Sequence, residues 1–303
     1  MLSYVARRLG QGMFSVIGVT VLIFVLVRVT GNPMDAMLPI DADEETRRLM
    51  AQNLGLDKSY LEQFGIFVWG LVHGDLGQSI RYSVPVWRLF TDSFPMTLGI
   101  VIPAFLLSLI VGIPLGVIAA TSRADVRALL SILGLVGLAI PTFWLGILLI
   151  QIFSLKLGWL PAGRTGSVQH YILPVITLAA FKLAALMRLV RSSMLDVLSA
   201  DYIKLARIKG LSEGIVVWKH ALRNSLTSAA SFMGVIIGVM IMGSVVVETV
   251  FAWPGSGRLI YTSILARDYP VVQGLVLIAS LFIIFLSIIM DILQALLDPR
   301  IRR

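Results

Sequence analysis

The chain has 303 residues, of which 57% are hydrophobic and 14% charged, and its mean hydropathy is +0.91. A soluble domain carries about 25% charged residues because its surface faces water, so this composition excludes an ordinary water-soluble protein. The net charge of +8 lies mostly in loops between apolar segments, which indicates membrane orientation and argues against a nucleic-acid partner. The lack of cysteine excludes disulfides, thiolate nucleophiles and thiolate metal sites.

Six apolar segments each come near the ~20 residues that a helix needs to cross a bilayer. Their backbone must be hydrogen-bonded internally in lipid, and they show no period-two alternation, so we predict an all-α integral membrane protein with six transmembrane helices. The predicted spans lie near 9–29, 95–120, 129–155, 171–190, 226–248 and 271–293. We expect the first to be an uncleaved span, because it is too long for a signal peptide. Gly112 and Gly116 favour close helix packing, and Pro141 is expected to bend the third span.

The basic residues predict that both termini lie in the cytoplasm. With the N-terminus inside, the short inside segments hold 14 of the 25 basic residues, and the longer outside loops hold nine. The inside residues are Arg7, Arg8, Arg123, Arg127, Arg188, Arg191, Lys204, Arg207, Lys209, Lys219, Arg223, Arg300, Arg302 and Arg303. The predicted regions are an N-terminal span at 1–30, an extracytoplasmic region at 31–94, a five-span core at 95–293 with a cytoplasmic loop at 191–225, and a cytoplasmic tail at 294–303.

The outside loop between the first two spans is too long for a simple connection, so we expect it to contain helices of its own. Asp41 is predicted to cap a short helix that begins with Asp43 and two glutamates and ends at Gly55. A second, amphipathic helix is predicted from Ser59 to Val72. Its apolar stripe suits the membrane surface or the outer mouth of the spans.

The long inside loop contains the segment DYIKLARIKGLSEGIVVWKHALRN at 201–224. Asp201 is predicted to cap a helix that runs through Lys209, with Gly210 in its C-terminal turn. Ala206 and Gly210 would share a shallow face between basic residues, and Ser212 would cap a second helix through Trp218 to Asn224. Two interpretations remain open on physical grounds: a docking helix for a soluble partner, or a basic loop that only fixes orientation.

Taken together, several motifs of the chain resemble those of ABC importer permeases, in the form of the dipeptide, oligopeptide and nickel group. The inside loop resembles their EAA loop, and the similarity extends over nearly the whole chain. The matching motifs are GDLG at 74–77 with Ser79, PMTL at 95–98, IPTFWLG at 140–146, WLP at 159–161, DYI at 201–203, AR at 206–207, KGL at 209–211, HALRN at 220–224, ETVF at 248–251, PGSG at 254–257, RDYP at 267–270 and DPRIR at 298–302. The chain departs from the family pattern after HALRN, where the usual proline is missing.

The resemblance implies a type I ABC importer permease fold in a bacterial cytoplasmic (inner) membrane. It implies a second homologous permease subunit, two ATPase subunits and an extracytoplasmic substrate-binding protein as partners. The residues it implies for ATPase coupling are Asp201, Tyr202, Ala206, Arg207, Lys209, Gly210, Leu211 and His220. ATP and Mg²⁺ are expected on the ATPase subunits, because this chain has no GxxxxGK[ST] phosphate loop. No catalytic residue, metal ligand or cofactor is expected in this chain.

Lys182 is predicted to lie near the middle of the fourth span, where a cation is costly unless it faces a cavity or an acid. One interpretation places it on the translocation pathway, in contact with anionic parts of the cargo. The other has it snorkelling toward the cytoplasmic interface. Glu248, at the end of the fifth span, is the second pathway candidate. Asp291, near the inner end of the last span, is expected to pair with a basic residue.

Two other classes of function, an intramembrane protease and a secondary transporter, fit the sequence less well than a permease. An intramembrane protease would need a serine and a histidine at one depth, but His73, His170 and His220 are all predicted in loops. A secondary, ion-coupled transporter usually has paired acids or broken helices near the midplane, and Lys182 is the only charge predicted there. Peptides are the expected cargo of the permease, with glutathione, opines or nickel chelates as alternatives that this chain does not distinguish.

Overall fold

The computed structural model describes residues 2–29, 34, 38, 42–53 and 55–297. The predictions for Asp41 and for the motif at 298–302 fall outside the described residues, as does the side chain of Asp291. Within the described part the chain is all-helical and contains no β-strand, only an isolated bridge between Gln78 and Pro85. The all-α fold class is therefore confirmed. The chain divides into two compact units, one of 2–95 with 258–285 and the other of 96–257 with the end of the chain.

Four described helices are long and apolar enough to cross a membrane, and a bent pair adds a fifth candidate. The four are α1 (Leu2–Val29), α5 (Val86–Thr121), α8 (Gln169–Leu198) and α13 (Tyr269–Leu297). The predicted fifth span corresponds to α11 (Leu222–Val250), whose stretch Ile236–Val250 is apolar. The count of six spans and the orientation of the termini stay predictions.

In the first unit, α1 packs against the start of α13 through Ile23, Val27 and Val272. The predicted amphipathic helix is α4 (Tyr60–Val72), and Ser59 closes a capping box with Glu62 at its start. Arg28, near the end of α1, donates from Nε and Nη2 to Gln63 Oε1 of α4 at 3.0 and 2.9 Å. This forked contact fixes α4 against α1.

The predicted short acidic helix is present as α3 (Glu44–Asn53). Asp43 precedes it, and the Asp43 carbonyl accepts from the amide of Arg47 at 3.1 Å. A hydrogen bond with Thr46 holds the pKa of the Asp43 carboxyl below its ordinary value. Among the described residues, Asp43 therefore satisfies the first turn of α3, which the sequence had suggested for Asp41.

The connection from α4 to α5 is organised by one buried carboxylate, Asp268, just before α13. Asp268 accepts from Ser79 Oγ at 2.5 Å and from the amides of Ile80 and Arg81 at 3.1 and 3.2 Å. Three donors satisfy the carboxylate, so its burial is not left uncompensated. These hydrogen bonds tie the turn between the GDLG motif and α5 to Asp268 of the RDYP motif within this unit.

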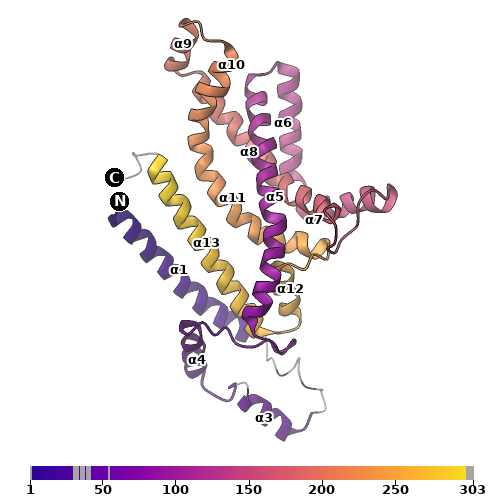
Figure 1. The fold of residues 1–303 in the computed structure, drawn as a ribbon. Helices are drawn as coiled ribbons and strands as arrows, with labels where there is room; N and C mark the ends of the chain where they lie inside the picture. The colour runs from indigo at the N-terminus through magenta and orange to yellow at the C-terminus, as the bar shows by residue number, and fades with distance from the viewer. Residues whose placement is uncertain (1, 30–33, 35–37, 39–41, 54, 298–303) are drawn as a thin grey trace. The chain divides into compact units, whose positions relative to one another are not determined.

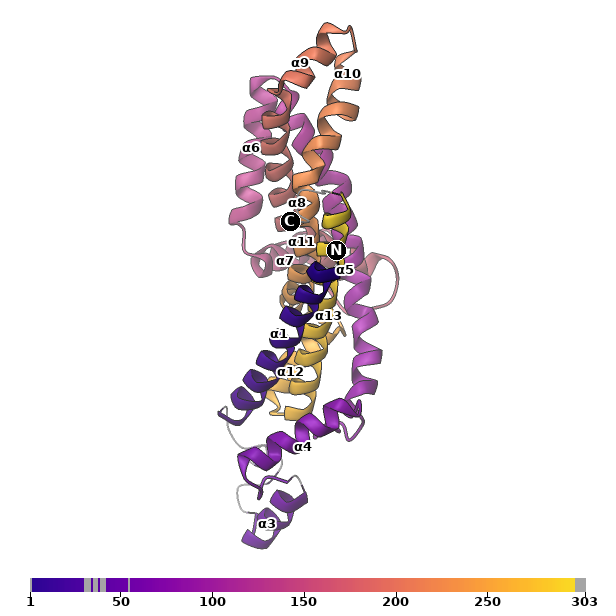
Figure 2. The same cartoon turned by 90° about the vertical axis from the view of Figure 1, so that its left-hand side faces the viewer.

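In the second unit, α5, α6 (Ala124–Ala139), α8 and α11 run alongside one another (Figures 1 and 2). The predicted close packing at Gly112 and Gly116 is confirmed, because a Cβ on Gly116 would lie 2.8 Å from the carbonyl oxygen of Met187 in α8. The cluster between these helices has Val117, Leu186, Val190 and other residues at its centre. The same cluster includes Ile203, Val216 and Ala221 of the loop that joins α8 to α11.

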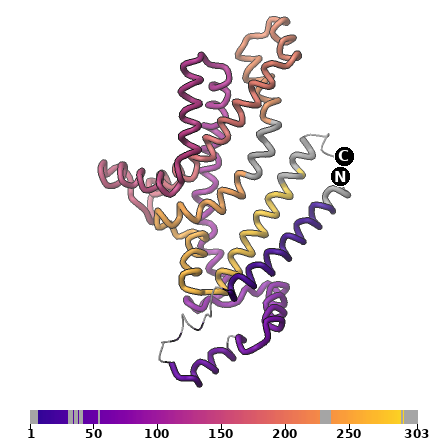
Figure 3. Tube along the Cα trace, turned by 180° about the vertical axis from the view of Figure 1, so that it is seen from behind, coloured from indigo at the N-terminus to yellow at the C-terminus, as the bar shows by residue number. Residues whose placement is uncertain are grey.

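The third predicted span is not one continuous helix. α6 ends at Ala139, and α7 (Thr142–Leu149) with the π-helical segment η1 (Ile150–Lys156) leaves at an angle of 102° to it. Figure 3 shows the chain turning aside at this point. Ile140 and Pro141 are both extended, because proline lacks an N–H and disfavours helix at the residue before it. The expected bend at Pro141 is thus a complete break, and the predicted boundary of 129–155 is wrong as a single helix.

Candidate functional site

The strongest candidate site is the loop that joins α8 to α11. Its first helix is α9 (Asp201–Ile208), which lies at the end of the helical bundle (Figure 1). Asp201 does not cap this helix as predicted: the N-cap is Ala200, and Asp201 is the first helical residue, where its carboxylate accepts from Lys204 Nζ at 2.9 Å. An acid in the first turn still suits the helix dipole.

One face of α9 is anchored in the core, and the opposite face is exposed in the described part of the chain. Ile203 is fully buried in the cluster with Val216 and Ala221, and Ala206 packs against the same cluster. On the outward face, Ile208 is 81% exposed, and Tyr202 and Leu205 are about half exposed. Apolar side chains exposed next to one another on one helix face form a candidate interaction surface.

The turn after α9 depends on Gly210. Gly210 has φ of +79°, a conformation in which a side chain is strained, and the Gly210 amide donates to the Arg207 carbonyl at 2.9 Å. Arg207 then reaches across the turn, and its Nε donates to Glu213 Oε1 at 2.6 Å. The predicted Gly210 turn is confirmed, and the ion pair holds both sides of it together.

The second half of the loop is a continuous helix into α11. It consists of α10 (Glu213–Ile215) and the π-helical segment η2 (Val216–Ala221). Ser212 occupies the N-cap position as predicted, but its hydroxyl makes no capping hydrogen bond. Trp218 is half exposed and lines a cavity of about 550 Å³ together with Arg207 and Glu213.

The predicted coupling residues therefore fall into two groups. Tyr202, Arg207, Lys209, Gly210 and Leu211 are exposed on or after α9, together with Asp201. Ala206 and His220 are half-buried, and Ala206 packs against the core cluster. Sequence reasoning missed Leu205, Ile208 and Trp218, although large apolar residues in an otherwise charged loop were a signal for them.

The second candidate, Glu248, is fully buried at 0% exposure. Its Oε1 accepts from Thr97 Oγ1 at 2.7 Å and from Ser244 Oγ at 3.0 Å. Thr97 has one hydroxyl proton, which it gives to Glu248, so Ser256 Oγ donates to Thr97 across their 2.9 Å contact. The Ser256 amide also donates to Thr97 Oγ1, at 2.9 Å. These contacts join α5, α11 and α12 (Ser256–Leu265) at one point.

The PGSG motif packs directly on this carboxylate. A Cβ at Gly255 would lie 2.5 Å from both carboxylate oxygens of Glu248, and one at Gly257 would lie 2.9 Å from Oε2. Only glycine fits at such distances. The buried Trp253 donates from Nε1 to the Met96 carbonyl at 2.9 Å, which closes the turn over the start of the span. In this chain Glu248 is thus a packing centre and does not line an open surface.

Lys182 lies in the middle of α8 and is half-buried. Its Nζ lies 4.8 Å from the ring centroid of Phe181, a distance suited to a cation–π contact. Both interpretations of this lysine, pathway and snorkelling, remain compatible with its position.

A bundle of long apolar helices, with a short helix that exposes apolar side chains at its end, fits the class of membrane transport permeases. Residues 112–303 match the family of binding-protein-dependent transport system inner membrane components. The chain belongs to this family, which supplies the inner-membrane permeases of ABC importers. It is 41% identical over 304 residues to the glutathione transport system permease protein GsiC of Escherichia coli strain K12, covering 100% of this chain and 99% of that protein. The same values hold for GsiC of Shigella dysenteriae serotype 1.

Solved structures agree on the fold. An inward-facing form of the MetNI methionine ABC transporter matches with a TM-score of 0.57 and 16% identity, covering 70% of this chain and 97% of that one. An amino acid ABC transporter crystallised with histidines matches with a TM-score of 0.52 and 16% identity, over 70% and 94% of the two chains. The family and fold expected from the resemblance are confirmed.

Proposed function

We propose that this permease subunit forms half of the translocation pathway of an ATP-driven importer for glutathione-like or other short peptides. The likeness to the glutathione permease along the full chain supports a peptide-like cargo. A second homologous permease would complete the pathway, and an extracytoplasmic binding protein would deliver the cargo. ATP and Mg²⁺ would bind only to the two ATPase subunits.

The exposed apolar face of α9 is the observation that carries the proposal. Each ATPase subunit would receive Tyr202, Leu205 and Ile208 in a groove, with Gly210 and Leu211 at its edge. Buried Ile203 packs α9 firmly against the bundle. A displacement of α9 by the ATPase subunit would therefore also move α8 and α11. Arg207 and Glu213 would keep the loop in one shape while it is pushed.

Crosslinking tests this docking directly, because the chain has no cysteine to remove. Ile208→Cys should crosslink to an ATPase subunit that carries cysteines around its groove, and the yield should change with ATP. Val168→Cys, equally exposed at 81% but before α8, is the matched control and should not react. Equal yields at the two positions would overturn the docking role of α9.

The cargo is tested by uptake in cells that express the whole transporter. Labelled glutathione should enter and be competed by di- and tripeptides, and the binding protein should bind the same compounds. Uptake of a nickel chelate without competition by peptides would contradict the proposed cargo while leaving the docking test untouched.

A further inference from the structure

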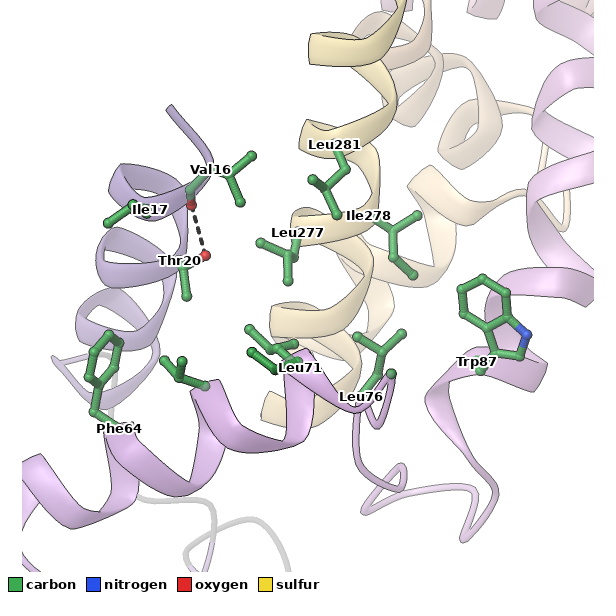
Figure 4. A pocket seen from close by; sticks show the side chains of 13 residues that line it. Val16, Ile17, Thr20, Phe64, Leu71, Leu76, Trp87, Leu277, Ile278 and Leu281 are labelled. Carbon is green, nitrogen blue, oxygen red and sulfur yellow. Dashed lines mark hydrogen bonds between the residues drawn. The ribbon is translucent and has the colours of Figure 1, made fainter. Parts of the chain in front are cut away.

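A large apolar cavity lies within the first unit, between α1, α4 and α13 (Figure 4). Its volume is about 540 Å³. α1 contributes Val16 and Thr20 to its wall, α4 contributes Phe64 and Leu71, and α13 contributes Leu277. Nothing in the permease function described above uses this cavity.

The chemistry of the wall excludes water and ions as occupants. No charged side chain among the described residues lines the cavity, and the Thr20 hydroxyl donates to the Val16 carbonyl at 2.8 Å. A buried water needs two to four polar partners, which this wall does not offer. The wall therefore suits a hydrocarbon.

The position of the cavity matches one leaflet of a bilayer. α1 and α13 are both membrane-spanning candidates, and Val16 lies thirteen residues before Val29, the end of the first span. At 1.5 Å per residue that is about 20 Å, while half of the hydrocarbon core is about 15 Å. Measured along α1, the cavity thus extends from the interface next to α4 through one leaflet and roughly 5 Å beyond the bilayer centre.

The cavity is also continuous with the lipid-facing surface of the spans. Ile17 and Leu281 line it and are about half exposed, and Trp87 lies at its edge with its indole ring about half exposed. Tryptophan is enriched at the membrane interface, where its ring sits at the level of the headgroups. A chain can therefore enter sideways from the bilayer without crossing a polar barrier.

We propose that this cavity binds one acyl chain of a phospholipid from the leaflet next to α4. Because no charge lines the wall, the site recognises the chain and not the headgroup. The bound chain fills the space between α1, α4 and α13 and supports α4 on the spans. The proposal rests on the membrane placement of the chain and is independent of the cargo.

Photo-crosslinking in membranes that contain the assembled transporter tests it. A phospholipid with a diazirine on its acyl chain should label peptides of both α1 and α4. Val16→Trp fills the cavity and should reduce that labelling several-fold, while Val21→Trp, on the lipid-facing side of the same helix, should not. Leu277→Trp repeats the filling from α13 if Val16→Trp fails to assemble. Unlabelled phosphatidylethanolamine and phosphatidylglycerol should compete equally.

Three results would overturn the proposal. Equal labelling of the two tryptophan variants would mean general contact with the bilayer. Crosslinks from this cavity to the second permease, with no lipid label, would mean a protein occupant. A strong preference for one headgroup would contradict recognition of the chain alone.

Discussion

The hydroxyl of Thr97 donates to the carboxylate of Glu248 across 2.7 Å, although the two residues are 151 positions apart in the chain. Both side chains are fully buried, and Ser256 binds the same hydroxyl from the start of α12. The start of the second predicted span, the end of α11 and the PGSG turn are therefore one cooperative unit.

Thr97→Val keeps the shape of the side chain but removes the hydroxyl at this junction. The Ser256 amide loses its acceptor and Glu248 loses a donor, and each unsatisfied buried group costs about 1–3 kcal/mol. We expect a clear fall in the melting temperature of the purified protein. Thr91→Val, on the exposed side of the same helix, should leave it unchanged. Equal melting temperatures for the two variants would show that the junction is not stabilising.

Gly210 is expected to be intolerant of side chains. Its φ of +79° costs about 1–2 kcal/mol for most residues but less for asparagine. Gly210→Val and Gly210→Glu should insert normally and abolish substrate-stimulated ATPase activity of the assembled transporter, while Gly210→Asn should retain much of it. Gly214→Ala adds a methyl group into open space in the same loop and is the control. Full activity of Gly210→Glu would contradict the coupling role.

Orientation can be decided by chemical labelling of single cysteines. With cytoplasmic termini, Val168→Cys should react with an impermeant maleimide from outside intact cells or spheroplasts, and Ile208→Cys should react only after permeabilisation. Both residues are 81% exposed, so a difference in labelling reports sidedness and not burial. The reverse pattern would invert the predicted topology.

Lys182 is expected to act on anionic cargo through its charge. Lys182→Met should lower uptake of an anionic peptide more than uptake of a neutral one. Lys182→Arg keeps the positive charge and should retain most of the parent's uptake of the anionic peptide. The comparison measures initial uptake rates at matched expression. Equal effects on the two cargoes would favour the snorkelling interpretation, because a lysine at the interface does not meet the cargo.

The capping box of α4 predicts a pH dependence. Hydrogen bonds from the backbone and hydroxyl of Ser59 lower the pKa of Glu62 below its ordinary value. A lowered folded-state pKa stabilises the fold above the unfolded pKa, and the contribution is lost as pH falls through the folded value. Glu62→Gln should therefore melt earlier than the parent at neutral pH, and the gap should close in acid. A gap that is constant with pH would contradict this.

The sequence predicted best what depends on local rules. Four of the predicted spans, the acidic helix α3, the amphipathic helix α4 and the glycine turn after α9 follow from hydropathy, capping and backbone freedom. The direction of α9 could not be predicted from the sequence, because it depends on the packing of Ile203 against Val216 on the far side of the turn at Gly210. Nor did the burial of Glu248, because its partner Thr97 is distant in sequence. Pro141 marked the break in the third span, but the angle depends on how α7 packs against α8 and α11.

The π-helical segment η2 lies between α10 and α11, with one extra residue in its turn. Removing one residue from 216–221 would restore a regular α-helix without breaking the chain. Because a π turn holds about one residue more than an α turn, five residues of α-helix would cover nearly the same rotation as the six of η2, and α9 would keep its direction relative to α11. One residue removed from the regular part of α11 would instead rotate α9 by about 100°, so η2 is where this helix can lose a residue without turning the exposed α9 face.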